Sequence, residues 1–140
     1  MSAKALVLDA NILIRAVLGA RARQLILQYA ASTLFFAPDV AYEDARHYLP
    51  ALLQKRGMDP GSALLVLDAL ADVVRPLDLE LYQHLKADAL SRIGTRDEDD
   101  WPVLACAMLI DCPVWTEDND FFGTGVATWT SDRVELFLGA

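Results

Sequence analysis

Hydrophobic residues in this chain form short, uninterrupted runs that alternate with longer segments of helical periodicity. The runs fall at 4–9, 33–36, 73–77, 114–115 and 127–129 and predict strands. Between them, apolar residues recur every three or four positions, which predicts helices at 11–18, 21–31, 39–55, 60–71, 78–92, 101–110 and, capped by Ser131 or Asp132, up to Leu138. Strands that are apolar throughout are typical of a parallel sheet covered on both faces. The pattern therefore predicts an α/β fold, a three-layer α/β/α sandwich with a mostly parallel central sheet.

The length of 140 residues predicts a single domain, 1–140, with a core of its own. No stretch of 18 or more uncharged apolar residues occurs, so we expect no membrane span. The first residues do not have the layout of a signal peptide. Cys106 and Cys112 are too few for a disulfide framework or a zinc site. Together these features predict a reduced, cytoplasmic protein with two buried thiols.

The chain is acidic, with 20 Asp and Glu against 12 Lys and Arg and a formal net charge of −8. Such a balance argues against a polyanionic partner, because nucleic-acid binding normally depends on basic residues. That objection weakens if several carboxylates surround a divalent cation, since the cation brings positive charge to the place where a phosphate approaches. The hydrophobic content of 54% also suggests a surface covered by a partner or a second copy.

Several acids stand where a predicted buried strand ends. Asp9 follows Ala5-Leu6-Val7-Leu8, and Asp118 and Asp120 follow Val114-Trp115-Thr116. A charge at such a position must be solvated, paired or bound to a cation. In open α/β sheets, ligands bind at the carboxyl ends of the strands. The alternatives are that Asp9 or Asn11 only caps the following helix and that the later acids are ordinary turn residues.

Two further acids are candidates on weaker local signals. Glu43 lies one turn into the helix after the second strand, where it could also be a solvated residue favoured by the helix dipole, and Asp44 competes with it. Asp100 precedes a helix of small apolar residues, but Asp97 and Asp99 in the same run are rivals for its role.

Consecutive βα units would bring these carboxylates to one edge of the sheet. Two carboxylates about 4 Å apart repel by about 4 kcal/mol at an effective dielectric constant near 20. A hard divalent cation with oxygen ligands removes this conflict. The sequence therefore predicts a site for Mg²⁺ or Mn²⁺.

The order of these motifs resembles that of PIN domains, and in particular of VapC-type toxins of toxin–antitoxin pairs. The resemblance spans residues 6 to about 122 and is carried by Leu8-Asp9-Ala10-Asn11-Ile12-Leu13, a Glu after the second strand, Asp100-Trp101-Pro102-Val103-Leu104-Ala105 and Trp115-Thr116-Glu117-Asp118-Asn119-Asp120-Phe121. It implies a compact α/β/α fold and a Mg²⁺- or Mn²⁺-dependent ribonuclease activity. By position it implies an acidic quartet of Asp9, Glu43, Asp100 and Asp118, a further metal ligand at Asp120, and supporting polar residues at Asn11 and Thr116.

The leading hypothesis is a metal-dependent endoribonuclease that hydrolyses RNA phosphodiester bonds. The resemblance further implies a toxin role, an antitoxin protein that covers the acidic cleft, and a homodimer. The alternative is a non-catalytic PIN-like module that binds RNA or a protein, and a third reading is another Mg²⁺-dependent α/β domain such as a phosphatase or phospho-receiver. The bases that could contact phosphates are Arg15, Arg21, Arg23, Lys55, Arg56, Arg92 and Arg96.

Overall fold

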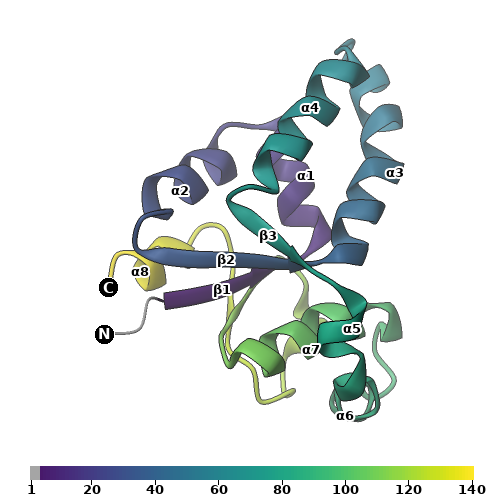
Figure 1. The fold of residues 1–140 in the computed structure, drawn as a ribbon, viewed down its shortest axis with the longest axis vertical. Helices are drawn as coiled ribbons and strands as arrows, with labels where there is room; N and C mark the ends of the chain where they lie inside the picture. Colours follow the sequence, from purple (N-terminus) through teal and green to yellow (C-terminus); the bar gives the residue numbers. More distant parts are fainter. Residues whose placement is uncertain (1–3) are drawn as a thin grey trace.

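The structure is a computed structural model that describes residues 4–140, and its centre is a five-stranded sheet (Figure 1). The strands are β1 (Lys4–Leu8), β2 (Thr33–Pro38), β3 (Val74–Leu77), β4 (Val114–Trp115) and β5 (Thr128–Trp129). They lie in the order β3-β2-β1-β4-β5, and every neighbouring pair is parallel. The predicted α/β/α class with a parallel sheet is confirmed.

The helices connect the strands in the predicted alternation. They are α1 (Ala10–Leu18), α2 (Arg21–Tyr29), α3 (Asp39–Lys55), α4 (Pro60–Leu70), α5 (Leu79–Tyr82), α6 (Lys86–Ile93), α7 (Trp101–Ile110) and α8 (Val134–Leu138). Short 3₁₀ turns occur at η1 (Gln83–Leu85), η2 (Glu98–Asp100) and η3 (Asn119–Phe121).

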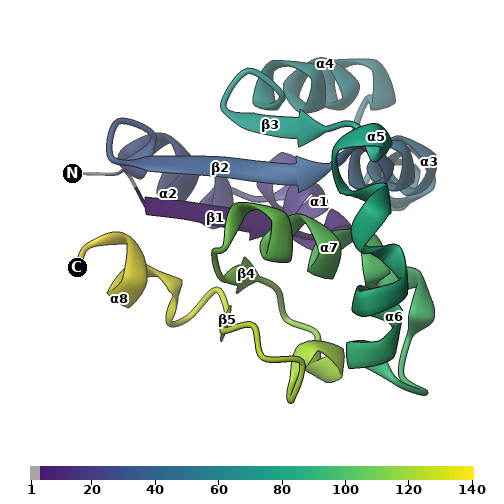
Figure 2. The same cartoon turned by 60° about the horizontal axis from the view of Figure 1, so that its bottom comes forward.

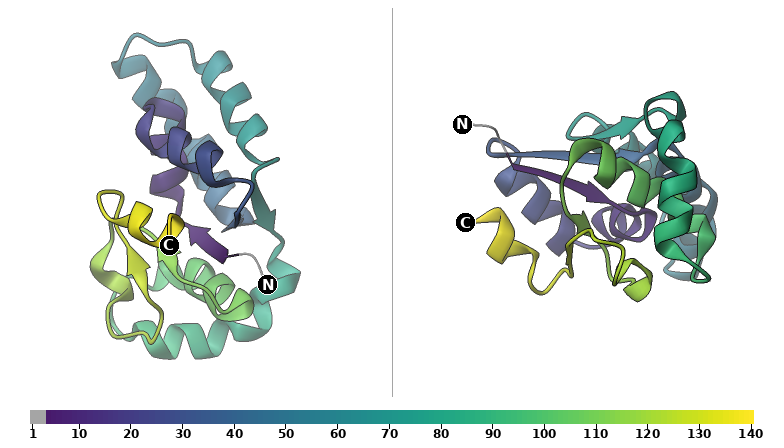
Figure 3. Two further views of the ribbon diagram at one scale, coloured as in Figure 1. Left: turned by 90° about the vertical axis from the view of Figure 1, so that its left-hand side faces the viewer. Right: turned by 90° about the horizontal axis from the view of Figure 1, so that it is seen from below.

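Alternating side chains of the sheet enter two separate cores. Leu6 and Leu8 of β1 belong to the core formed with α1–α4 and α8, whereas Val7 belongs to the core formed with α5–α7. Figure 2 shows the two helical layers on opposite faces of the sheet. The last helix, α8, lies beside the start of β1 in both views of Figure 3, where Lys4 Nζ donates to the carbonyl of Phe137 at 2.9 Å. These packed layers account for strands that are apolar on both sides.

The order of the strands creates a switch point between β1 and β4. The chain leaves β1 toward β2 and β3 on one side, and returns through α5–α7 to β4 on the other side. A crevice forms where the connections from two adjacent parallel strands diverge, outside the carboxyl ends of those strands. The residues that follow β1 and β4 therefore face each other across this crevice.

Helix α7 supports the crevice from below the sheet. Its residues from Pro102 to Ala107 are buried, and Ala105, Cys106 and Ala107 are small enough to let the helix approach the strands closely. Because Asp100 directly precedes α7, the close packing of this helix also positions Asp100 at the crevice. Of the two predicted buried thiols, Cys106 is buried and Cys112 is half-buried.

Several predicted elements differ from the structure by one or two residues at their ends, and two differ in more than their bounds. The single helix expected at 78–92 is broken into α5, η1 and α6, and the break follows Tyr82, whose buried hydroxyl donates to Asp39 and whose ring packs on Trp101. The last helix begins at Val134 without a side-chain cap, because Ser131 instead accepts a hydrogen bond from Trp115 Nε1. Both differences arise from tertiary contacts that local periodicity does not contain. Within residues 4–140, no helix is long and apolar enough to cross a membrane.

Candidate metal centre

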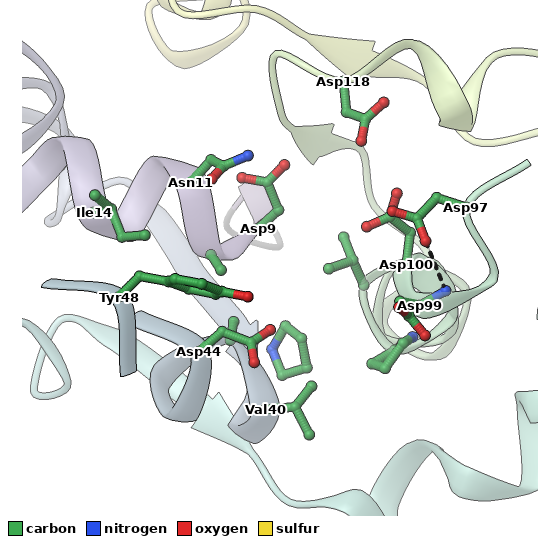
Figure 4. Close-up of a pocket in the computed structure, with 15 residues that line it drawn as sticks. Asp9, Asn11, Ile14, Val40, Asp44, Tyr48, Asp97, Asp99, Asp100 and Asp118 are labelled. Carbon is green, nitrogen blue, oxygen red and sulfur yellow. Dashed lines mark hydrogen bonds between the residues drawn. The ribbon is translucent and has the colours of Figure 1, made fainter. Parts of the chain in front are cut away.

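A pocket of about 330 Å³ lies at the carboxyl ends of β1 and β4 (Figure 4). In Figure 4, Asp9 and Asn11 face it from the start of α1, and the 97–100 segment faces it from the opposite side. Asp118 reaches it from the loop after β4. Its polar lining consists of Asp9, Asn11, Asp44, Tyr48, Asp97, Asp99, Asp100 and Asp118. No lysine or arginine from the described residues lines it, and of the acids at this site Asp120 has the charge of Arg96 near it, which opposes the rise of its pKa.

Asp9 is held rigidly at the inner wall, with only 7% of its surface exposed. One oxygen, Oδ1, accepts the backbone N–H of Ile12 at 3.1 Å and so caps α1, as one alternative from the sequence proposed. The other, Oδ2, accepts the hydroxyl of Thr116. Burial raises the pKa of Asp9, the hydrogen bonds from Thr116 and Ile12 oppose that rise, and the negative charge of Asp118 adds to it. Asp9 is thus both a helix cap and a pocket residue.

Thr116 connects the two strand ends. Its buried hydroxyl donates to Asp9 and accepts the backbone N–H of Asp118 at 2.9 Å. Asp118 Oδ1 in turn accepts the backbone N–H of Asp120 at 3.0 Å, which starts the turn η3. This chain of hydrogen bonds sets the position of Asp118 relative to Asp9.

Four carboxylates form a tight group at the edge of the pocket, and three of them line it. Asp97, Asp100, Asp118 and Asp120 each offer one oxygen, and these four oxygens lie within 4.8 Å of one another. Burial, together with the charges of Asp118 and Asp97, raises the pKa of Asp100 to about 8. Partial burial and the charge of Asp118 also raise the pKa of Asp120. The group is under electrostatic repulsion that a cation would relieve.

The donors present fit a divalent cation. Asp100 Oδ2 is buried and has no hydrogen-bond partner among the described residues, although a buried carboxylate oxygen normally has one. Hard cations such as Mg²⁺ and Mn²⁺ prefer carboxylate oxygens and complete their coordination with water. A cation bound between these four acids would supply the missing partner of Asp100.

The predicted site residues do not all meet in the pocket. Asp9, Asn11, Asp100 and Asp118 line it, Thr116 lies directly behind Asp9, and Asp120 belongs to the acidic group. Glu43 is exposed and does not line the pocket. It lies instead near Tyr82, and its negative charge is one of the causes that raise the pKa of Tyr82.

Residues that sequence reasoning did not select also contribute. Asp44, the weaker candidate on α3, lines the pocket, and Tyr48 lies one helical turn after it (Figure 4). Asp97, considered only as a rival of Asp100, joins Asp100 in the same group. Two features of the sequence could have indicated these residues. Asp44 and Tyr48 are four positions apart and so share a helix face, and Asp97 belongs to a run of four consecutive acids.

Comparison with known proteins identifies the family. A family model described as a PIN domain matches residues 7–139. The chain belongs to the PIN domain family. No curated protein sequence matches it.

Solved structures share the PIN fold of this chain at low sequence identity. VapBC2 from Rickettsia felis, bound to a DNA fragment from their promoter, is 10% identical with a TM-score of 0.66, covering 90% of this chain and 98% of that chain. VapBC-1 from nontypeable Haemophilus influenzae is 13% identical with a TM-score of 0.60, covering 92% and 99%. FitAB bound to an IR36 DNA fragment is 17% identical with a TM-score of 0.53, covering 90% and 94%. At these identities the likeness concerns the fold alone.

Proposed function

We propose that this PIN domain is a Mg²⁺- or Mn²⁺-dependent endoribonuclease that hydrolyses RNA phosphodiester bonds. The observation that carries the proposal is the group of four carboxylates at the sheet's switch point, one of which has a buried oxygen without a partner. Acids gathered in this way are costly unless a cation binds them. A cation also answers the objection from net charge, because it gives an acidic protein a local site for a phosphate.

The residues of the pocket divide into ligands and supports. Asp100 and Asp118, with Asp97 and Asp120, hold the cation, and Asp9 faces it from the opposite wall. A divalent ion bound there supplies positive charge to the phosphate and lowers the pKa of a water molecule. Thr116 keeps Asp9 oriented. The exposed side chain of Asn11, at the rim, is available to hydrogen-bond the substrate.

The test is cleavage of a single-stranded RNA by the purified protein with Mg²⁺, Mn²⁺ or EDTA. We expect cleavage with either metal and none with EDTA. Asp118→Asn removes a ligand charge, so its activity should fall by more than the roughly 10–100-fold that loss of an outer-shell partner causes. Asp72→Asn is the matched control, because Asp72 is exposed before the amino end of β3 and does not line the pocket at the carboxyl ends of the strands. Activity that survives both EDTA and Asp118→Asn would refute the mechanism.

We also propose that the protein is the toxin of a toxin–antitoxin pair, acts in the cytoplasm, and forms a homodimer. The resemblance to VapC-type toxins supports the toxin role, and exposed apolar side chains such as Leu65 and Leu136 support a protein partner. Expression of the wild-type chain should slow bacterial growth, whereas Asp118→Asn at equal expression should not. Equal growth of the two strains, with active wild-type protein, contradicts the toxin role.

The non-catalytic alternative is favoured by one observation. Both oxygens of Asp9 already accept hydrogen bonds from the protein, and Glu43 lies outside the pocket, so the implied quartet is not assembled. Titration calorimetry distinguishes the two functions. The nuclease requires Mn²⁺ or Mg²⁺ binding that Asp118→Asn weakens, whereas RNA binding without any metal binding supports the alternative.

A further inference from the structure

A second hollow, of about 470 Å³, is lined by arginines. It lies where α1 ends, α2 begins and α3 has just ended, and we call it the arginine hollow. Its charged lining consists of Arg15, Arg21 and Arg56, with Leu18 and Ser131 beside them. This gathering is notable in a chain with a net charge of −8 and only 12 basic residues.

Most cations elsewhere in residues 4–140 are committed to the protein itself. Lys4, Arg23 and Arg96 donate to backbone carbonyls. Arg46 pairs with Asp68, and Arg92 pairs with Asp88. Lys4, Arg23 and Arg96 are therefore poorly available to a ligand, whereas Arg46 and Arg92 form exposed ion pairs outside the metal centre and the arginine hollow.

The arginines of the hollow are differently placed. The side chain of Arg56 has no hydrogen bond or ion pair with any described residue. Arg15 is 3.9 Å from Glu117 and Arg21 is 3.2 Å from Glu135, with 56% and 63% of their side chains exposed. Exposed pairs of this kind contribute about 0–1 kcal/mol, and a guanidinium has five N–H donors, so both retain donors for an anion.

The hollow and the metal centre lie one helical turn apart along one face of α1. Asn11 and Ile14 line the acidic pocket, and the residues four positions later, Arg15 and Leu18, line the hollow. Residues four apart lie one turn, about 6 Å, along the same helix face. The loop that carries Asp118 borders the hollow too, since Glu117 accepts the backbone N–H of Ser131 at 2.6 Å. Both pockets therefore border α1 and the loop that carries Asp118, within reach of one bound strand.

We propose that the arginine hollow binds a backbone phosphate of the RNA strand whose neighbouring phosphodiester lies at the metal centre. The inference rests on the proposed function and deepens it by assigning a substrate subsite. Planar guanidiniums bind phosphate oxygens bidentately, and converging arginines are suited to a phosphate. The contacts involve the backbone only, so this subsite contributes affinity without sequence preference.

The experiment measures RNA affinity as a function of salt. A labelled, unstructured short RNA is titrated by fluorescence anisotropy in Ca²⁺, with a gel confirming that the RNA remains intact. For single strands, each phosphate contact contributes about −0.7 to the slope of log K against log salt concentration. Arg56→Gln and Arg15→Gln should each make the slope shallower, and the double variant should lose about 0.7, the contribution of the single phosphate in the hollow.

Two control variants make the result specific. Arg56→Lys keeps the charge and should keep the slope. Arg75→Gln also removes an exposed charge, here from the edge strand β3 outside both pockets, and should leave the slope unchanged. The proposal is overturned if Arg56→Gln and Arg15→Gln retain the wild-type slope, if Arg75→Gln has the same effect as they do, or if the wild-type protein does not bind RNA. If Arg56→Gln and Arg15→Gln retain the wild-type slope for RNA but no longer bind an acidic protein partner, the hollow binds that partner instead.

A cleavage assay separates this inference from the proposed function. A dinucleotide has a single phosphodiester and cannot occupy both sites, so Arg56→Gln should slow its cleavage much less than the cleavage of a longer RNA. A longer RNA should be cleaved more slowly by Arg56→Gln, through a higher KM. Failure of the wild type to cleave either substrate would refute the nuclease, while the salt slope still decides whether the hollow binds RNA.

Discussion

At the scale of single residues, the site depends on the small hydroxyl of Thr116. It satisfies one oxygen of the buried Asp9 and the backbone N–H of Asp118 at the same time. An apolar side chain of the same shape can neither donate to Asp9 nor accept from the N–H of Asp118. The position of Asp118 relative to Asp9 is therefore decided by one group, and the resemblance that assigned Thr116 a supporting role acquires a physical reason.

Replacement of Thr116 tests this coupling. Thr116→Val leaves a buried acceptor and a donor unpaired, which should cost about 1–3 kcal/mol of unfolding free energy and also weaken divalent-ion binding. Thr116→Ser retains the hydroxyl and should keep most of both. Urea unfolding and calorimetry with Mn²⁺ measure the two effects. Equal ion affinity in the Val and Ser variants would mean that the hydroxyl does not position Asp118.

Glu43 and Asp44 pose a second question at this scale. Neighbouring residues of a helix point about 100° apart, so only one of them can face the pocket, and the structure turns Asp44 toward it. We therefore expect Asp44→Asn to reduce RNA cleavage more than Glu43→Gln. Both variants remove one charge from an exposed position, so each is the control for the other. A larger loss of RNA cleavage in Glu43→Gln would contradict this prediction and support the role of Glu43 that the family resemblance implies.

At the scale of elements, the loop after β4 presents two of the acids and is held by arginines from the α6 side. Arg96 donates to the carbonyls of Asp120 and Phe122, and Arg92 donates to that of Thr124 at 3.1 Å. Gly123 has a φ of +82°, which favours glycine in the turn between these contacts. The loop is thus anchored by contacts with a distant part of the chain.

Release of this anchor should affect the metal centre more than the fold. Arg96→Gln removes charge-assisted hydrogen bonds to the loop but no core contact, so divalent-ion affinity should fall on the order of tenfold. The melting temperature without metal should change little. Arg75→Gln, with its exposed side chain on β3, is the control. Unchanged ion affinity in Arg96→Gln would show that the loop holds its shape without the anchor.

At the scale of the whole molecule, the acidic pocket costs stability when no cation is bound. The folded state raises the pKa of Asp100 from an ordinary 3.8 to about 8 through burial and the charges of Asp118 and Asp97. Between these pH values the folded chain holds a proton that the unfolded chain has lost. Stability falls with rising pH wherever the folded state binds more protons, so the contribution of Asp100 declines from about pH 4 to about pH 8.

Thermal unfolding across this range tests the sign. In EDTA, the melting temperature of the wild type should fall as pH rises toward 8, and Asp100→Asn should show a weaker dependence. Saturating Mg²⁺ or Mn²⁺ should raise the melting temperature most at high pH, because the cation binds the deprotonated acids. A metal-induced increase that is the same at pH 5 and pH 8 would contradict this account.

The sequence by itself determined the class of fold, the order of strands and helices, and the acids that follow two of the strands, because these features depend on local periodicity and on neighbouring residues. Asp9 and Asp118 could be predicted because a carboxylate directly after a buried strand stands out without any knowledge of partners. Only the tertiary structure decided that Asp44 rather than Glu43 faces the pocket, that Asp97 joins Asp100, and that Arg15, Arg21 and Arg56 converge. These outcomes depend on the rotation of packed helices and on contacts between segments far apart in the chain, which no local pattern encodes.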